Sequence, residues 1–345
     1  MINKPPHISV MRDETIQALA LRDDGVYVDA TAGAGGHSAA ILQGLGQHGR
    51  LIAIDRDPAA IKAVRQRFAD DPRVETFHAP FSQLDKVIAG LGLTGKVDGV
   101  LLDLGVSSMQ LDQPERGFSF MRSGSLDMRM DSASGLTLAE WLAEVDEQQL
   151  IKVLREYGEE RFAKRIARAI RERHHDEPLT TTLELAELVA RANPHHERKK
   201  HPATRTFQAL RIALNDELGE LKRVLAQVIG LLATGGRLVV LSFHSLEDRI
   251  VKQFIQEFSQ VGADIPLDLP VTETHAEAPL IRVRVGKKPS RAEVQANPRS
   301  RSAIMRVAQR TRAEVQPAPF EESTESRYRR TSPAGKPTLF VGAVA

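Results

Sequence analysis

A glycine-rich turn between two apolar segments constrains the fold of this chain more than any other feature. Residues 26–30 form an apolar segment typical of a strand, and a turn containing Gly33, Gly35 and Gly36 follows it. An apolar-periodic stretch of about ten residues comes next, and then a second apolar segment at residues 51–54. This order predicts a β-α-β unit whose backbone amides and helix N-terminus face a ligand.

The residues around this turn indicate which ligand it binds. Asp55 ends the second segment, where a carboxylate can accept hydrogen bonds from ribose hydroxyls. Ser38 takes the last position of a G-x-G-x-x-G pattern, and Asp29 at the end of the first strand suits a positively charged ligand better than a pyrophosphate. We therefore interpret the unit as a site for S-adenosylmethionine. The alternatives are a site for NAD and a glycine turn that binds no ligand.

Composition excludes several classes of protein. The 345 residues contain no cysteine, so there are no disulfides, thiolate metal sites or cysteine nucleophiles. No apolar run approaches the ~20 residues that span a bilayer, and no basic-then-apolar leader begins the chain; we expect a cytoplasmic protein without a membrane partner. His195, His196 and His201 lack a carboxylate at ligand spacing, so we expect no metal.

Charge is unevenly distributed. The net charge is only +2, and residues 1–150 carry 14 Lys or Arg against 21 Asp or Glu, a balance of −7. Residues 281–312 carry ten basic residues against one acid, and residues 191–211 carry six against one. Two basic stretches on an otherwise acidic protein favour a polyanionic partner such as nucleic acid, although a solvated basic face is the alternative.

Further apolar segments complete an open α/β sheet. Residues 74–79 and 237–243 read as strands, and residues 97–104 form a near-continuous apolar strand that ends at Asp103. One long helix is predicted over residues 204–232. In such sheets ligands bind at the carboxyl ends of the strands.

The stretch between Gly105 and Ala203 is too long for an ordinary crossover. A polar loop over 110–131 precedes helical periodicity over 138–193, including a basic amphipathic helix over 160–173. We predict a sheet domain in two parts, 1–108 and 204–312, with an inserted loop and helical substrate-recognition subdomain at 109–203. A tail at 313–345, rich in Pro, Ser, Glu and Arg, is expected to be mobile.

Longer segments resemble the bacterial MraW/RsmH methyltransferases. The resemblance implies a class I S-adenosylmethionine-dependent methyltransferase, with a Rossmann-like open sheet, that methylates the N4 amine of a cytidine in small-subunit (16S) ribosomal RNA. Departures are Ser9 in place of a usual proline and the run 122–125 in place of Asp-Gly-Pro. The matching segments are HISVMRDE (7–14), DATAGAGGHS (29–38), IDRDPAAI (54–61), LLDLGVSSMQLDQPERGFSF (101–120), LDMRMD (126–131), TRTFQALRIALNDEL (204–218), SFHSLEDRIVK (242–252) and NPRSRSAIMRV (297–307).

The resemblance also implies a set of cofactor contacts. Glycines allow close approach of the backbone because they lack a Cβ atom. An aromatic ring after the third strand would cover adenine, and a buried strand-end carboxylate needs a cationic or donor partner. The residues are Gly35, Gly36, His37, Asp55, Phe81, Asp103 and Gln110.

Catalysis requires in-line positioning of the amine and the activated methyl group. We assign Asp103, or a nearby carbonyl or hydroxyl, as the acceptor for the N4 amine. Ser107 and Ser108 could instead cap a helix, and His244 could line the site or cap the next helix.

Arg299, Arg301, Lys199 and Lys200 are predicted to contact RNA phosphates. The partner is ribosomal RNA or the 30S subunit, and the protein acts as a monomer or a homodimer. An NAD-dependent oxidoreductase and a non-enzymatic RNA-binding protein that keeps the cofactor as a structural ligand remain open.

Overall fold

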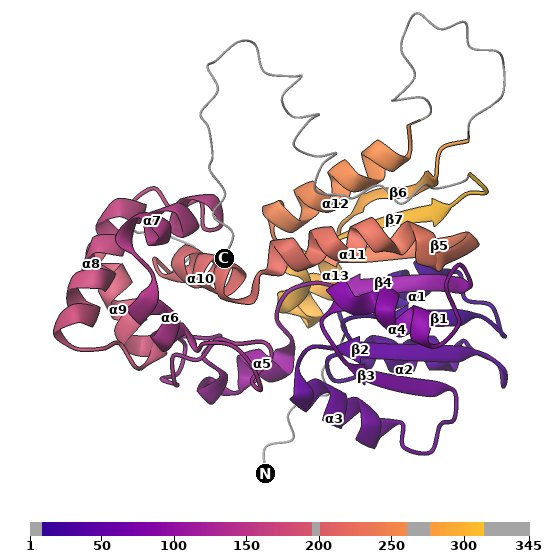
Figure 1. Ribbon diagram of the computed structural model, residues 1–345, viewed down its shortest axis with the longest axis horizontal. Coiled ribbons are helices and arrows are strands. Elements are labelled where there is room, and N and C mark those ends of the chain that lie inside the picture. Colours follow the sequence, from indigo (N-terminus) through magenta and orange to yellow (C-terminus); the bar gives the residue numbers. More distant parts are fainter. Residues whose placement is uncertain (1–8, 195–200, 261–276, 314–345) are drawn as a thin grey trace, which may run out of the picture.

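A seven-stranded sheet in the order β3-β2-β1-β4-β5-β7-β6 forms the centre of the computed structural model, which describes residues 9–194, 201–260 and 277–313 (Figure 1). Strands β1 to β5 pair in parallel, while β7 runs antiparallel between β5 and β6. The strands are β1 (Val26–Asp29), β2 (Arg50–Asp55), β3 (Val74–His78), β4 (Val97–Asp103), β5 (Leu232–Ser242), β6 (Leu280–Lys287) and β7 (Ile304–Arg310). The predicted open α/β sheet is confirmed, whereas β6 and β7 were not predicted.

Helices cover both faces of the sheet because alternate strand residues are apolar on both sides. Tyr27 and Leu101 pack in one core with α1 (Arg12–Leu19) and α2 (Gly36–Gln43), and α3 (Pro58–Arg67) lies on the same face against Ala53. Val28 and Leu102 pack in the other core with α4 (Leu84–Gly90), α11 (Glu217–Leu231) and α12 (Ser245–Phe258). The strand order reverses between β1 and β4, which is where open α/β sheets bind ligands.

A second group of helices has its own hydrophobic core beside the carboxyl end of the sheet (Figure 1). It contains α6 (Leu138–Glu144), α7 (Glu147–Glu156), α8 (Ala163–Asp176), α9 (Thr182–Ala192) and α10 (Thr204–Asn215), and we call it the helical cluster. Its core includes Phe207 and Leu210 of α10. The second part of the sheet domain was predicted to begin at residue 204, so α10 was predicted to belong to the sheet domain and not to the helical insertion. The division into domains stays a prediction.

The prediction of one long helix over residues 204–232 is wrong. The chain forms α10 and α11, and Asp216 between them has a left-handed backbone with φ of 48°. This break lets α10 join the helical cluster while α11 packs on the sheet. The remaining short helices are α5 (Ser108–Asp112) and α13 (Arg291–Ala296), with 3-10 turns at Phe81–Gln83, Pro114–Arg116 and Pro298–Ser302. Within the described residues, none of the helices has the length and apolar character to cross a bilayer.

Asn215 fastens the joint at this break. Its buried side chain accepts a hydrogen bond from the Met130 amide at 2.7 Å and donates to the Met128 carbonyl at 2.9 Å. Its own carbonyl accepts from Nη1 of Arg56 at 2.8 Å. The residue therefore connects α10, the loop over 126–131 and the end of β2.

We expect Asn215→Ala to lower the free energy of unfolding by about 2–4 kcal/mol, because two buried backbone groups lose their partners. Urea denaturation followed by fluorescence of the sole tryptophan, Trp141, measures this from within the helical cluster. Gln149→Ala removes an exposed amide from α7 and serves as the control. Equal denaturation midpoints for the two variants would contradict this role of Asn215.

Candidate functional site

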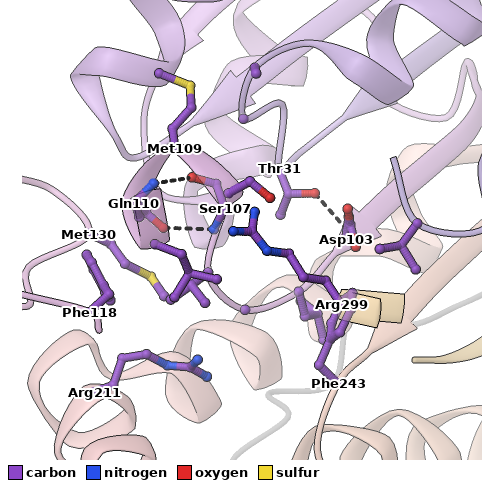
Figure 2. A pocket seen from close by; sticks show the side chains of 18 of the residues that line it. Thr31, Asp103, Ser107, Met109, Gln110, Phe118, Met130, Arg211, Phe243 and Arg299 are labelled. Atoms are coloured by element: carbon purple, nitrogen blue, oxygen red, sulfur yellow. Dashed lines mark hydrogen bonds between the residues drawn. The ribbon is translucent and has the colours of Figure 1, made fainter. Parts of the chain in front are cut away.

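A cavity of about 550 Å³ lies at the carboxyl ends of the strands, between the sheet and the helical cluster. The β1–α2 turn and the ends of β2 and β4 form one wall, and residues of the 105–130 segment and α10 form the other. Figure 2 shows Asp103 and Thr31 on the sheet side, with Phe118, Met130 and Arg211 on the opposite side. Seven of the residues predicted to contact the cofactor or RNA line this cavity: Gly36, His37, Asp55, Phe81, Asp103, Gln110 and Arg299.

The glycine turn requires its glycines for different reasons. Gly33 and Gly35 have φ of 52° and 76°, a conformation that residues with a Cβ atom adopt at a cost. A Cβ atom on Gly36 would lie 2.1 Å from Oγ of Ser9, so this position has no room for a side chain. Gly35 precedes the first residue of α2 and shapes the turn, although it is not among the lining residues.

Asp55 holds the turn and also lines the cavity. Its carboxylate accepts hydrogen bonds from the amides of Gly33 and Asp57, both at 2.8 Å. Burial raises the pKa of Asp55 to about 6, although these two amides act in the opposite direction. Asp55 does not cap the helix that follows it, because the cap of α3 is Asp57, whose side chain accepts from the Ala59 amide.

Two further acids and a histidine lie next to the turn, and of these Asp29 and His37 are buried while Asp103 is half-buried. Oδ2 of Asp29 accepts from Oγ of Ser38 at 2.7 Å, and Nε2 of His37 lies 3.5 Å from Oδ2 of Asp103. Burial opposes the charge on His37, but the contact with Asp103 raises its pKa above the ordinary value. In the described part of the chain, Oδ1 of Asp103 is buried without a hydrogen-bond partner. The Asp103 amide donates to Oγ1 of Thr31 at 2.7 Å, which fixes this strand end (Figure 2).

The opposite wall combines apolar rings with a charged cluster. Arg211 pairs with both carboxylate oxygens of Glu217, at 2.7 and 2.9 Å. His244 lines the cavity and also caps α12 through the Glu247 amide, so both alternatives raised for it hold. Ligand atoms of Glu217, His244 and Glu247 lie within 4.8 Å of one another, a grouping that their sequence spacing did not reveal. The guanidinium of Arg211 already supplies positive charge beside these carboxylates.

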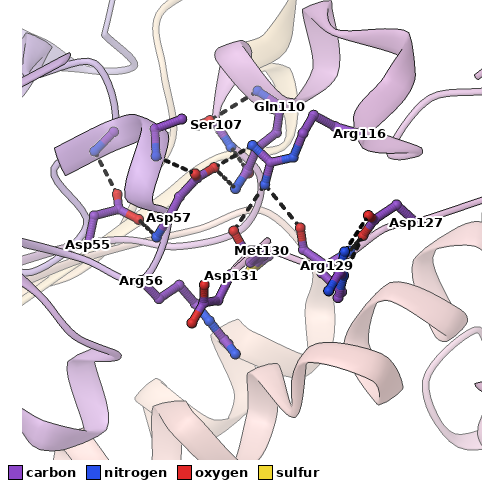
Figure 3. A network of polar contacts seen from close by, with 12 residues as sticks. Asp55, Arg56, Asp57, Ser107, Gln110, Arg116, Asp127, Arg129, Met130 and Asp131 are labelled. Atoms are coloured by element: carbon purple, nitrogen blue, oxygen red, sulfur yellow. Dashed lines mark hydrogen bonds and ion pairs between the residues drawn. The ribbon is translucent and has the colours of Figure 1, made fainter. Parts of the chain in front are cut away.

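A network around Asp57 joins the two walls (Figure 3). The Asp57 carboxylate, 3% exposed, accepts from Nη1 of Arg116 at 2.7 Å and from Nε2 of Gln110 at 3.0 Å. Nη2 of Arg116 donates to the carbonyls of Arg129 and Met130, both at 3.0 Å. Sequence reasoning missed Arg116, since no local pattern marks a side chain whose partner is 59 positions away.

The same network gives Gln110 a structural task. Its side-chain oxygen accepts from the Ser107 amide at 2.9 Å, while Oγ of Ser107 accepts from the Gln110 amide. Ser107 therefore caps α5, which was the alternative considered for it. Gln110 lines the cavity, but both ends of its amide group are already bonded within the protein.

The residues predicted to contact RNA are only partly described. Nη2 of Arg299 lies at the cavity rim, 2.8 Å from Oδ1 of Asp112, and Arg301 is exposed on the same 3-10 turn. Lys199, Lys200, His195 and His196 fall outside the described residues, as does the tail from residue 314.

Comparison with known proteins agrees with this architecture. A relative from Alteromonas mediterranea, named ribosomal RNA small subunit methyltransferase H, is 53% identical over 310 residues, which cover 89% of this chain and 98% of that protein. An rRNA methylase from Streptococcus thermophilus matches with a TM-score of 0.36 at 14% identity, over 90% of this chain and 99% of that one. A methyltransferase homologue from Pyrococcus horikoshii matches with a TM-score of 0.41 at 11% identity, over 88% and 68%.

The sheet order and the sequence match identify the fold. The class I methyltransferase fold predicted from the sequence is confirmed. The family model of the MraW methylase family matches residues 4–311, which is nearly the whole described chain, and the chain therefore belongs to the MraW methylase family.

Proposed function

We propose that the protein transfers a methyl group from S-adenosylmethionine to the N4 amine of a cytidine in small-subunit ribosomal RNA. Family membership and the name of the 53% identical relative support this reaction. The structural observation that carries it is the position of Asp103, a half-buried strand-end carboxylate with one buried oxygen, between a glycine-turn wall and an aromatic wall. The protein would act in the cytoplasm, on ribosomal RNA or the 30S subunit, as a monomer or a homodimer.

The sheet wall fits the cofactor in our proposal. Gly36 presents its backbone to the cavity, Gly35 gives the turn its left-handed conformation, and Asp55 accepts hydrogen bonds from the ribose hydroxyls. Phe81 covers the adenine, and Asp103 favours a ligand that carries positive charge, while Asp29 lies behind the cavity wall and accepts from Ser38. His37 orients Asp103 through their contact, and Gln110 fixes the loop that closes the site.

The helical-cluster wall fits the acceptor nucleoside. Phe118, Phe207 and Met130 present apolar surface to a base, and Arg211 offers a guanidinium beside them. The cofactor supplies an activated methyl group, so the protein needs to align the amine with it. Asp103 accepts a hydrogen bond from the N4 amine and thereby helps its nitrogen lone pair leave conjugation with the ring.

Replacing Asp103 tests this role. We expect Asp103→Ala to abolish methyl transfer while the protein stays folded, because its carboxylate is placed where cofactor and amine meet. The assay is transfer of a labelled methyl group to 30S subunits that lack the modification, followed by nucleoside analysis, with circular dichroism to confirm folding. Normal turnover by the folded variant would remove Asp103 from the reaction.

The same assay separates the alternatives. A wild-type protein that binds S-adenosylmethionine and RNA but transfers no methyl group would be a non-enzymatic RNA-binding protein. Quenching of nicotinamide fluorescence on addition of the protein would instead indicate an NAD site.

The affinity for the cofactor should depend on the ionisation of Asp55. With a pKa of about 6, the carboxylate becomes protonated and loses acceptor strength as the pH falls from 7.5 to 5. We expect affinity to fall about tenfold between pH 7.5 and pH 5, about fivefold of it below pH 6, because the ionised fraction of a group with this pKa falls in the same proportion. Asp55→Asn should bind more weakly by about 1–3 kcal/mol at pH 7.5 and lose most of this pH dependence. Isothermal titration calorimetry measures both, and an unchanged affinity would place Asp55 outside the cofactor site.

The ionisation of Asp55 affects the stability of the free protein in the opposite direction: cofactor affinity rises with pH, whereas the contribution of Asp55 to stability falls. The folded-state pKa of Asp55 lies above its unfolded value of 3.8, so ionisation is harder in the folded state. Its contribution to the free energy of unfolding therefore decreases as the pH rises from about 4 to about 6. A bound cofactor whose hydroxyls donate to the carboxylate would offset this loss.

The basic rim is expected to contact phosphates. Replacing Arg299 and Arg301 together by Gln should weaken binding to subunits and reduce the slope of log affinity against log salt by about 1–2, at roughly 0.7–0.9 per lost contact. The cofactor affinity should stay unchanged. A solvated basic face predicts no change, so wild-type RNA affinity together with a wild-type salt slope would reject the phosphate contacts.

A further inference from the structure

Met121 is exposed in a way that its neighbours are not. Its side chain is 83% exposed, the largest value among the exposed large hydrophobic residues of the described chain. The preceding Phe120 lines the cavity and packs against Phe207 and His201, with ring centroids 4.8 and 4.7 Å apart. The following residues, Arg122 and Ser123, are exposed and polar. Met121 is therefore a single apolar tip at the rim of the cavity.

The loop that carries Met121 is fixed on both sides. The Met121 amide donates to Oγ of Ser119 at 3.2 Å, and the Gly124 amide donates to Oγ1 of Thr182 on α9, also at 3.2 Å. A Cβ atom on Gly124 would lie 1.7 Å from the carbonyl oxygen of Pro114, so the backbone is packed closely there. Ser125 forms an isolated β-bridge with Thr181. These contacts hold the loop while they leave the methionine side chain in solvent.

Two guanidinium groups meet at Asp112, and one of them belongs to the residue that follows Met121. Nη2 of Arg122 donates to the carbonyl of Asp112 at 2.7 Å, and Nη2 of Arg299 pairs with the carboxylate of the same residue at 2.8 Å. Both arginine residues are exposed, and Asp112 itself lines the cavity. An exposed apolar side chain followed by an exposed arginine matches the chemistry of a nucleic acid, in which stacked bases alternate with phosphates.

We propose that Met121 is a wedge that inserts into the base stack of ribosomal RNA when the target nucleotide enters the cavity, with Arg122 and Arg299 contacting the flanking phosphates. The inference rests on the proposed function. A base that enters a cavity between two cores leaves its stack, which costs a few kcal/mol. An unbranched apolar side chain inserted at the vacated step offsets part of this cost.

An RNA partner suits this surface better than a protein partner. A protein interface of stable size needs a packed apolar centre formed by several residues. Here the exposed apolar surface of residues 118–125 is a single methionine, because Phe118 is buried and Phe120 faces the cavity. The residue that follows the tip, Arg122, is an exposed cation and not a further apolar group.

Steady-state kinetics of methyl transfer to unmodified 30S subunits tests the wedge. We expect Met121→Ala to lower kcat/KM about 10- to 100-fold, the range of one lost base contact. Met121→Leu, which keeps an apolar tip, should stay within about threefold of wild type. Leu136→Ala, a matched truncation of another exposed apolar residue, should leave the kinetics unchanged. Titration calorimetry should show wild-type cofactor affinity for all three variants, since neither residue lines the cavity.

A photoreactive benzophenone amino acid at position 121 identifies the partner directly. A cross-link to the RNA next to the methylated cytidine would support the wedge, whereas a cross-link to a ribosomal protein would overturn it. Wild-type kcat/KM for Met121→Ala would also overturn it while the proposed function stood. A wild-type protein that transfers no methyl group to subunits would overturn the proposed function and the wedge together.

Discussion

The geometry of the cavity depends on the buried ion pair between Asp57 and Arg116. The two walls belong to separate hydrophobic cores, and this pair lies between them (Figure 3). Loss of one partner of such a pair leaves an unpaired buried charge, at a cost of about 3–5 kcal/mol. Arg116 also donates to two carbonyls, and Gln110 donates to Asp57. These hydrogen bonds fix the orientation of the two charged side chains. The pair thus fixes how the loop over 114–131 lies against the sheet.

The carboxyl ends of the parallel strands concentrate negative charge at this cavity. Asp29, Asp55 and Asp103 end β1, β2 and β4, so the sheet itself brings three acids to one edge. Burial raises the pKa values of Asp29 and Asp55, which shows that ionising them in the free protein is unfavourable. A ligand with positive charge and hydroxyl donors relieves this cost. A pyrophosphate would add to it, which is the physical reason to prefer S-adenosylmethionine to NAD at this turn.

The sequence predicted the elements whose patterns are local. The glycine turn, the first five strands and the helical insertion follow from apolar periodicity and from glycines with left-handed backbones at Gly33 and Gly35. Strand β6 was missed because Arg282 and Arg284 alternate with apolar residues on an edge strand, so the segment reads as a basic surface. The break at Asp216 was missed because residues 204–232 keep helical periodicity, and only tertiary bonds of Asn215 mark the change of direction.

Prediction of the candidate site is limited in the same way. The sequence indicates which residues lie together, but not which hydrogen bonds they make within the protein. Gln110 and Ser107 were found by their motif, yet their side chains cap a helix and brace Asp57. The role of Arg116 can be identified only from the folded structure, in which it lies against Asp57. Residues with local roles can be read from spacing, whereas residues that connect two cores need the tertiary structure.

The positions of Asp55 and Asp57 explain how the two walls of the cavity are joined. The Asp57 amide donates to the carboxylate of Asp55, which faces the cofactor wall in our proposal, while the Asp57 side chain holds Arg116 and the loop of the opposite wall. Arg56 between them donates to the Asn215 carbonyl at the end of α10. Three consecutive residues after β2 therefore connect to the glycine turn, the helical cluster and the inserted loop. Because one short turn anchors both walls, the backbone at the end of a buried strand sets the spacing of the two walls of the cavity.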